Sequence, residues 1–485
     1  MNIRMLSWLA LSMLLLLAGC SDSGSDGSGI TLGGGLGAVV YLADQDTLGV
    51  FELYDVASGT KLNPALTPPK TIRSFALTQD GSAVVYIADQ DTPGTFELYR
   101  VSLAAPGISD KLSGVLAPGG NVMEFAVTPD SSAVVYRADQ TFDEVFELYR
   151  TVFAGLSRTK LNPDYLGSPA KDIDAFVIMP NGSGVVYRAD QDTDGVSELY
   201  RVSFANAPIS TRLISPAMVA TENVGAFAVT PDSSKVVFIA NLNSVTVDEL
   251  FFVLSGGGAT TRLNDVLVPN GNVDSFAITP DSLAVVYRAD QDEDEMFELY
   301  RKVIAGGLPD KLNLAFGTNS GKDVRSFAVL PDSSGVVYIA DQTANEVFEL
   351  YRTRFGGGNA RLNPAFVGAA QEVFDFVITP DSSAVVYRAD QDVNGVNELY
   401  RVLLANPGSS TRINPALDIG ENVAAPGTAT SYAVSPDSSA VVYRANQDNV
   451  NIVELFRTRF VSMGLSVKLN SPLVVGEDVA GFALR

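Results

Sequence analysis

The tripeptide Val-Val-Tyr recurs along the chain at a nearly constant interval, and this repetition constrains the fold more than any other feature. Successive copies, one of them Val-Val-Phe, lie 45 to 56 residues apart. They end at Tyr41, Tyr86, Tyr136, Tyr187, Phe238, Tyr287, Tyr338, Tyr387 and Tyr443. Length alone would suggest several unrelated domains for 485 residues. Nine copies of one unit indicate a repeat architecture instead.

Each unit contains four short runs rich in Val, Phe and Tyr, and turn residues separate them. In one unit the runs cover residues 276–281, 284–290, 297–301 and 311–313. Runs of this composition are typical of β-strands, and Pro-Asp-Ser and Asp-Gln-Asp-x-x-Gly are typical of the turns between them. No segment shows a convincing helical period. Four-stranded units at this spacing predict the blades of an all-β propeller.

The two ends of the chain complement each other. The first unit begins at residue 38 and lacks the Phe-Ala-Val-Thr-Pro-Asp strand, whereas residues 478–485 copy that strand and have nothing after it. We expect the C-terminal strand to complete the first blade, which closes the ring and removes an exposed sheet edge. The prediction is a single β-propeller of about nine four-stranded blades over residues 37–485.

The first 19 residues are typical of an export signal. Arg4 supplies a positive charge, and residues 5–17 form an apolar run too short to span a bilayer comfortably. The alternative is an ordinary signal peptide, or a membrane anchor, with a chance cysteine. The segment ends in Leu-Ala-Gly before Cys20, which resembles the lipobox of bacterial lipoproteins. The resemblance implies cleavage before Cys20 and lipidation of that residue, so that acyl chains hold the protein on a membrane.

Residues 20–36 carry the lipidated cysteine and a Ser-, Gly- and Asp-rich run that predicts a flexible tether. Ser21 follows the cysteine where lipoproteins retained in the inner membrane often carry Asp. We therefore expect a cell-envelope protein, with the outer membrane favoured in a Gram-negative organism and a periplasmic or surface-facing propeller.

Composition excludes several classes of partner and chemistry. The formal net charge is −23, which argues against nucleic acid and against the anionic bilayer surface as partners. The chain contains no histidine, and its single cysteine is Cys20. Catalytic triads with histidine, zinc sites of the usual kind and disulfides are therefore excluded.

The repeat motif resembles that of a known family. The run Thr-Pro-Asp-Ser-Ser-Ala-Val-Val-Tyr, then Glu-Leu-Tyr-Arg, then Lys/Arg-Leu-Asn, resembles the WD40-like Pro-Asp repeat of TolB-type propellers across residues 38–485. The resemblance implies a propeller fold. The chain departs from TolB in three ways: Ser usually replaces the turn glycine, the units are more numerous, and no N-terminal α/β domain precedes the ring. TolB's role in the Tol-Pal system therefore does not carry over.

Two of the Asp-rich loops have the spacing of a calcium-binding loop. They contain Asp190, Asp192, Asp194 and Glu198, and Asp390, Asp392, Asn394 and Glu398, with glycine at the sixth position. Alternating carboxylates at this spacing can wrap oxygen ligands around Ca²⁺. The alternative is structural, because Asp and Asn favour turns and the glutamate recurs in every unit. Ca²⁺ is the one cofactor that the sequence suggests.

A third set of candidates lies just before the phenylalanine of each inner strand, at a position where the residue varies among the units. The residues at this position are Arg73, Met123, Asp174, Gly225, Asp274, Arg325, Phe374, Thr430 and Ala480. Equivalent sites in a ring converge on its central channel, so residues that differ there are candidates for specific contacts. We select the charged members Arg73, Asp174, Asp274 and Arg325 as channel-mouth binding residues.

Three functions fit these patterns. The favoured one is a non-catalytic, membrane-anchored binding module for a protein, peptide or carbohydrate partner in the cell envelope. The second is a structural or adhesive Ca²⁺-binding propeller. The third is a propeller-class enzyme, a lyase or a glycosidase working with paired acids. It is disfavoured because the carboxylates occur in repeated loops and no singular pair stands out.

Overall fold

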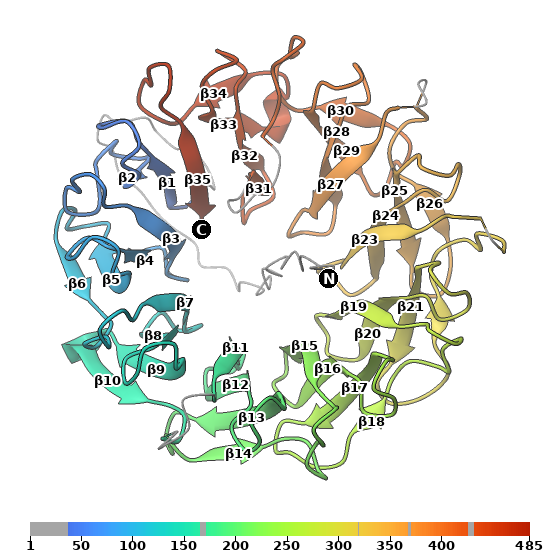
Figure 1. Cartoon of the computed structure of the whole chain (residues 1–485). Coiled ribbons are helices and arrows are strands. Elements are labelled where there is room, and N and C mark those ends of the chain that lie inside the picture. Colours follow the sequence, from blue (N-terminus) through green and yellow to red (C-terminus); the bar gives the residue numbers. More distant parts are fainter. Residues whose placement is uncertain (1–36, 165–170, 319, 367–369, 425–430) are drawn as a thin grey trace, which may run out of the picture.

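A computed structural model describes residues 37–164, 171–318, 320–366, 370–424 and 431–485. The predictions for the signal segment, Cys20 and the tether lie outside the described residues. The described chain forms nine antiparallel sheets arranged as a ring around a central opening (Figure 1). The only helical elements within these ranges are two 3₁₀ turns, η1 (Ala154–Leu156) and η2 (Phe460–Ser462). The prediction of a nine-bladed, all-β propeller is confirmed.

The strands of each blade occupy four positions from the centre outward. The innermost strands are β3 (Ile72–Leu77), β7 (Val122–Val127), β11 (Ile173–Ile178), β15 (Val224–Val229), β19 (Val273–Ile278), β23 (Val324–Val329), β27 (Val373–Ile378), β31 (Tyr432–Val434) and β35 (Val479–Leu484). The second strands are β1 (Val39–Ala43), β4 (Ala83–Ala88), β8 (Ala133–Ala138), β12 (Gly184–Ala189), β16 (Lys235–Ala240), β20 (Ala284–Ala289), β24 (Gly335–Ala340), β28 (Ala384–Ala389) and β32 (Ala440–Ala445).

The outer half of each blade is more uneven. The third strands are β2 (Glu52–Asp55), β5 (Glu97–Ser102), β9 (Glu147–Val152), β13 (Glu198–Ser203), β17 (Glu249–Leu254), β21 (Glu298–Val303), β25 (Glu349–Arg354), β29 (Glu398–Leu403) and β33 (Glu454–Arg459). The outermost strands are β6 (Ser109–Lys111), β10 (Ser157–Lys160), β14 (Ser210–Arg212), β18 (Thr261–Arg262), β22 (Asp310–Lys311), β26 (Asn359–Arg361), β30 (Ser410–Arg412) and β34 (Ser466–Lys468). We number the blades 1 to 9 in the order of their second strands.

Blade 1 joins the two ends of the described chain. β35 pairs with β1 in antiparallel register, with Tyr41 opposite Phe482, and β2 lies on the other side of β1. The predicted closure by the C-terminal strand is therefore confirmed. Blade 1 differs from the other eight in having three regular strands, since a single bridge between Tyr54 and Lys61 stands where the fourth strand would run.

The hydrophobic core lies between the blades. Nine clusters of buried side chains occupy the nine interfaces between neighbouring blades, including the one between blades 9 and 1. For example, Val85 and Ile87 of blade 2 pack with Val134 and Tyr136 of blade 3. A second strand is covered on both faces, which explains why its sequence is continuously apolar and does not alternate.

The repeated aromatic residues form one stack in every blade. The ring at the end of Val-Val-Tyr lies against the aromatic residue of the third strand, as Tyr86 does against Tyr99 with ring centroids 5.6 Å apart. The other eight blades have equivalent pairs, and Phe238 with Phe251 replaces the tyrosines in blade 5. Offset pairs of this kind are favourable beyond the area that they bury. The tyrosines are therefore packing elements of the repeat.

The serine that replaces the usual turn glycine links one blade to the next. Ser282 has a φ of 63°, in the left-handed region that favours glycine. Its hydroxyl accepts a hydrogen bond from the backbone N–H of Asp232, in the turn of the preceding blade, at 3.0 Å. The same contact recurs at Ser131, Ser233, Ser333, Ser382 and Ser438. The hydroxyl thus gives an inter-blade contact that glycine cannot make.

The two faces of the ring carry different connections. Tight turns between the first and second strands lie on one face, which we call the turn face. The Asp-rich loops between second and third strands, and the segments leading into the next inner strand, lie on the other, which we call the loop face. No helix among the described residues is long and apolar enough to cross a membrane.

Candidate functional site

The first aspartate of each Asp-rich loop is held by backbone groups. Asp190 accepts the N–H of Asp172 at 2.6 Å through Oδ1 and the N–H of Gly195 at 3.1 Å through Oδ2. Asp390 makes the same pair of contacts, to the N–H groups of Glu372 at 2.8 Å and Gly395 at 3.0 Å. Both carboxylate oxygens are therefore used to fasten the loop to the start of an inner strand.

This arrangement recurs in loops that lack the calcium spacing. Asp89 fastens the N–H groups of Thr71 and Gly94 in blade 2, and in blade 5 Asn241 accepts from the N–H of Asn223. The amide oxygen of an asparagine can replace one carboxylate oxygen of the aspartate, because a backbone N–H can donate to a neutral acceptor. The first position of the loop thus has a structural role throughout the ring.

The glutamate that opens each third strand is buried and paired with a cation. Glu398 is 1 % exposed, accepts from the N–H of Leu417 at 3.1 Å and the hydroxyl of Tyr400 at 2.9 Å, and lies 3.5 Å from Arg412. Glu198 lies likewise beside Tyr200, Met218 and Arg212. Burial, and after it the charge of Glu198, raises the pKa of Tyr200 well above its usual value.

The same ion pair is present in all nine blades. The cations that pair with this glutamate are Lys61, Lys111, Lys160, Arg212, Arg262, Lys311, Arg361, Arg412 and Lys468. The glutamate therefore makes the same contact in every blade, as a repeat-wide structural residue would. A buried carboxylate needs such a partner, because an unpaired buried charge is strongly unfavourable.

The remaining loop residues point to no shared metal site. Asp192 pairs with Arg212 at 3.1 Å and Asp392 with Arg412 at 3.3 Å. Asp194 and Asn394 are exposed in their loops. Across the part of the chain that the structure describes, no group of three or more Cys, Asp or Glu residues is arranged to hold a metal ion. Most of the oxygen atoms that the calcium prediction requires are thus engaged in contacts within the fold, and the described structure does not support a Ca²⁺ site.

The channel-mouth candidates occupy a distinctive point of the inner strands. In eight blades the pairing register between inner and second strands shifts near this position, so that Asp174, for example, has no partner between Ile173 and Ala175. A bulge of this kind redirects a side chain. Blade 9 is the exception, and its candidate Thr430 lies outside the described residues.

The acidic candidates are exposed and bound to arginines of their own blades. Asp174 pairs with Arg188 at 2.7 Å, and Asp274 pairs with Arg288 at 2.6 Å. The paired arginines also reach the next blade, since Arg188 donates to Val224 O at 3.1 Å and Arg288 to Val324 O at 2.5 Å. The structure thus places these acids in a network that crosses the blade interfaces, with their outer surfaces accessible.

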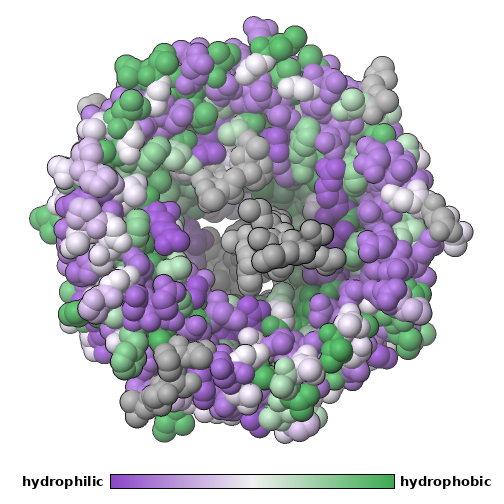
Figure 2. Space-filling model, in the orientation of Figure 1, coloured by the Kyte–Doolittle hydropathy of each residue, from purple (hydrophilic) through white to green (hydrophobic). Residues whose placement is uncertain are grey.

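The basic candidates lie over aromatic rings. The guanidinium of Arg73 is 5.6 Å from the centroid of Phe96, and that of Arg325 is 3.5 Å from the centroid of Phe348. Arg325 also pairs with Glu372 of blade 8 at 2.9 Å. The four charged candidates come from blades 2, 4, 6 and 7, so the structure distributes them around the ring. Figure 2 shows the central opening, with hydrophilic residues along part of its edge.

Sequence reasoning missed a hydrogen-bonded group between blades 8 and 9. Asp375 pairs with Arg388 at 2.6 Å and accepts the hydroxyl of Tyr432 at 2.6 Å. Burial, and after it the charge of Asp375, raises the pKa of Tyr432 well above its usual value. The signal was present, because Asp375 stands where most blades have a small residue and Tyr432 stands where the other blades have phenylalanine.

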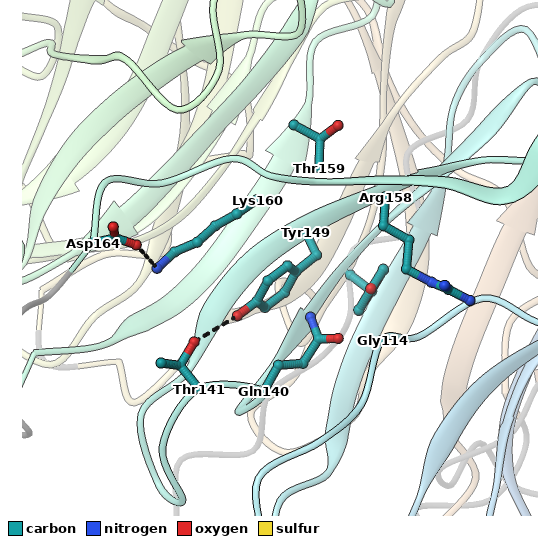
Figure 3. A pocket seen from close by; sticks show the side chains of 9 residues that line it. Gly114, Gln140, Thr141, Tyr149, Arg158, Thr159, Lys160 and Asp164 are labelled. Atoms are coloured by element: carbon teal, nitrogen blue, oxygen red, sulfur yellow. Dashed lines mark hydrogen bonds and ion pairs between the residues drawn. The ribbon is translucent and has the colours of Figure 1, made fainter.

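A pocket of about 340 Å³ lies on blade 3. Its lining includes Gln140, Thr141, Arg158 and Lys160, and Figure 3 shows Gln140 between Tyr149 and Gly114. Within the pocket view, Lys160 reaches Asp164 at 2.7 Å, and the Tyr149 hydroxyl lies 3.4 Å from Thr141 Oγ1. The sequence analysis did not identify this site.

These features define the class of protein as a nine-bladed β-propeller. Comparison with known proteins shows similarity in fold only. No family model matches the chain, and no curated protein matches it. Dipeptidyl peptidase 4 of Porphyromonas gingivalis is similar, with a TM-score of 0.56, 10% identity and coverage of 81% of this chain and 59% of the peptidase, less than two thirds of its length.

Two further solved structures represent other functions. A structure described as the eukaryotic initiation factor has a TM-score of 0.55 and 10% identity, covering 90% of this chain and 100% of that one. The structural neighbours include a putative TolB from Agrobacterium tumefaciens, with a TM-score of 0.31 and 18% identity, covering 50% of this chain and 81% of that one. The initiation factor and the peptidase are similar to this chain in fold, and identities this low show nothing more.

Proposed function

We propose that this chain is a lipid-anchored protein of the cell envelope whose propeller is a non-catalytic binding module for a protein, peptide or carbohydrate. The observation that carries the proposal is the diversity at the inner-strand bulge. That position holds a different side chain from blade to blade and is exposed at Arg73, Asp174, Gly225, Asp274 and Arg325. The position just before it is uniform, since the eight bulged inner strands all carry a buried Ile or Val there. A uniform scaffold that presents varied side chains at one ring of positions suits specific recognition.

The use of the carboxylates supports binding over catalysis. The buried glutamates are paired with cations, and the first loop aspartates accept backbone N–H groups. A glycosidase needs two acids with different environments flanking one substrate bond. The repeated acids instead have nearly the same environment in every blade. The fold similarities do not choose between the functions, because the two structures with TM-scores above 0.5 are a peptidase and an initiation factor.

The anchor part of the proposal depends on Cys20 and the apolar segment before it. In the producing organism, the wild-type chain should fractionate with membranes. The Cys20→Ser variant should move to the soluble envelope fraction, since a lipid chain contributes about 0.8 kcal/mol per buried methylene. Equal membrane association of both chains would rule out lipid anchoring through this residue.

The binding part is tested by capture from envelope extract with the purified full chain. The proposal predicts a saturable ligand that is recovered chemically intact after prolonged incubation. Recovery of a cleaved or eliminated product, formed at a rate that scales with protein concentration, would assign the chain to the enzymes instead.

A further inference from the structure

Blade 3 departs from a hydrogen bond that the other tyrosine-bearing blades share. In seven blades the hydroxyl of the second-strand tyrosine donates to a glutamine that follows the strand, as Tyr86 does to Gln90 at 2.7 Å. The other six pairs start from Tyr41, Tyr187, Tyr287, Tyr338, Tyr387 and Tyr443. Tyr136 is 0 % exposed, and its hydroxyl makes no hydrogen bond within the described structure.

The reason lies in two sequence changes around Gln140. Residue 114 is glycine where the repeat often has proline, and Gln140 fills the space, since a Cβ at residue 114 would overlap Gln140 Oε1. In addition, Arg158 stands opposite Thr151 at the register position that Ser109, Ser210, Ser410 and Ser466 hold in other blades. Those serines accept from the corresponding glutamine, as Ser109 does from Gln90 at 3.0 Å. Blade 3 has lost both partners of the usual network.

The result is a pocket with Tyr136, whose hydroxyl is buried and unpaired, among its lining residues. The pocket is lined by Tyr136, Gln140, Thr141 and Arg158, among others. Burial raises the pKa of the Tyr136 phenol, which therefore stays protonated and can donate. A buried polar group without a partner is unfavourable, so a ligand atom that bonds to it binds with added strength.

The two cationic side chains of the pocket differ in whether a carboxylate pairs with them. Lys160 is already paired, with Glu147 and with Asp164. Arg158 donates through Nε to Leu112 O at 2.8 Å and through Nη2 to Lys111 O at 2.8 Å, which fixes its guanidinium against blade 2. No ion pair to Arg158 is present in the described ranges. A fixed guanidinium without a carboxylate partner favours an anionic ligand group, and its planar donors match a carboxylate.

We propose that the blade 3 pocket binds a small hydroxylated carboxylate. Arg158 holds the carboxylate, while the Tyr136 hydroxyl, the Gln140 amide and Thr141 Oγ1 bond to ligand hydroxyl groups. The volume of about 340 Å³ is at the lower end of small-molecule sites. The inference goes beyond the proposed function, because it adds a second site, separate from the inner-strand bulges, and names the ligand class of that site.

Calorimetric titration of the purified full chain tests this with two matched probes. Glucuronate carries both the carboxylate and the hydroxyl groups, and glucose carries hydroxyl groups on the same ring without the carboxylate. Glucuronate should bind about tenfold or more tightly than glucose, as expected for a charge-assisted contact to arginine. Equal affinity for the two sugars, or no binding of glucuronate, would overturn the inference.

Two variants locate the site without endangering the fold. Arg158→Ser introduces the serine that four other blades carry and should weaken glucuronate binding about tenfold or more, with a melting curve to check that the variant is folded at the temperature of the titration. Tyr136→Phe copies Phe238 of blade 5; it should weaken binding several-fold and keep or raise the melting temperature, because it removes an unpaired buried hydroxyl.

The control is Arg354→Gln, which removes an exposed arginine of blade 7 and should leave glucuronate affinity unchanged. Wild-type affinity in both blade 3 variants would place any glucuronate elsewhere and overturn the proposal. Capture of an envelope ligand by a chain that binds no glucuronate would overturn the pocket assignment and leave the proposed binding function intact.

Discussion

At the scale of single residues, side chains that look functional in the sequence mostly maintain the ring. Asp190 fastens two backbone N–H groups, and Glu198 receives hydrogen bonds from Tyr200 and Met218. Acidic loops in a strongly acidic protein invite an interpretation as cation sites. Their oxygens are instead acceptors for groups that the fold must satisfy.

The inter-blade hydrogen bond of the turn serine can be tested by substitution. Ser282→Ala keeps the left-handed φ and loses the hydrogen bond from Asp232 N, so the free energy of unfolding should fall by about 1 kcal/mol. Ser282→Gly loses the same bond but relieves the backbone, which offsets about 1 kcal/mol. Chemical denaturation of the two variants should therefore rank glycine above alanine.

Two results with the Ser282 variants would contradict this prediction. If the alanine variant is as stable as wild type, the hydroxyl makes no net contribution between blades. If glycine is less stable than alanine, backbone strain at this turn is not relieved by glycine, and the account of the serine fails.

At the scale of elements, the blades are joined by arginines as well as by apolar clusters. Arg188 and Arg288 reach the inner strand of the following blade. Third-strand arginines reach the following blade just after its third strand, since Arg100 lies 4.6 Å from the ring centroid of Phe153 and Arg401 lies 4.5 Å from that of Phe460. The blades that carry these arginines therefore contribute a cation to their successors, in addition to the hydrophobic contact. Blades 1 and 5 lack them, with Leu42 and Asp55, and Ile239 and Phe252, at the two positions.

The interface between blades 9 and 1 allows a test of these arginine contacts. Arg444 donates to Val479 O at 3.3 Å and to Ala480 O, both on the strand that closes the ring. Its burial lowers the arginine pKa. Arg444→Gln should reduce the free energy of unfolding by about 1–3 kcal/mol, because carbonyl acceptors lose a charged donor.

The measurement is chemical denaturation followed by tyrosine fluorescence, with Arg354→Gln as the control. Arg354 is exposed at the end of β25, and its replacement should change stability by less than about 0.5 kcal/mol. Equal effects of the two substitutions would show that the seam contact is not stabilising.

The sequence was sufficient for the elements and insufficient for the contacts between them. The strands, their order and the pairing of residues 479–484 with β1 followed from the repeat and its two incomplete ends. The role of Asp190 did not, because its acceptor contact to Asp172 joins residues that only the blade geometry brings together. The blade 3 pocket was missed for the same reason: Gly114, Gln140 and Arg158 lie on three separate segments.

At the scale of the whole molecule, nine interfaces of similar composition form one closed ring. The cluster between blades 9 and 1 unites Val39 and Tyr41 with Val442 and Leu455, so the seam is as apolar as the other interfaces. Stability is thus distributed around the ring, as expected when every repeat is supported by two neighbours. Residues that differ among the blades are then free to serve recognition.

The central claim is that the varied residues at the inner-strand bulges, and not the repeated acids of the loops, carry binding. The most direct measurement is quantitative capture of envelope ligand by wild type and by a variant that combines Arg73→Gln, Asp174→Asn, Asp274→Asn and Arg325→Gln. A control variant carries Asp110→Asn and Arg354→Gln on the exposed outer parts of the blades, and a melting curve checks the fold of all three chains. The bulge variant should lose most of the captured ligand, while the control variant retains it. Full capture by the folded bulge variant would show that these residues do not carry binding.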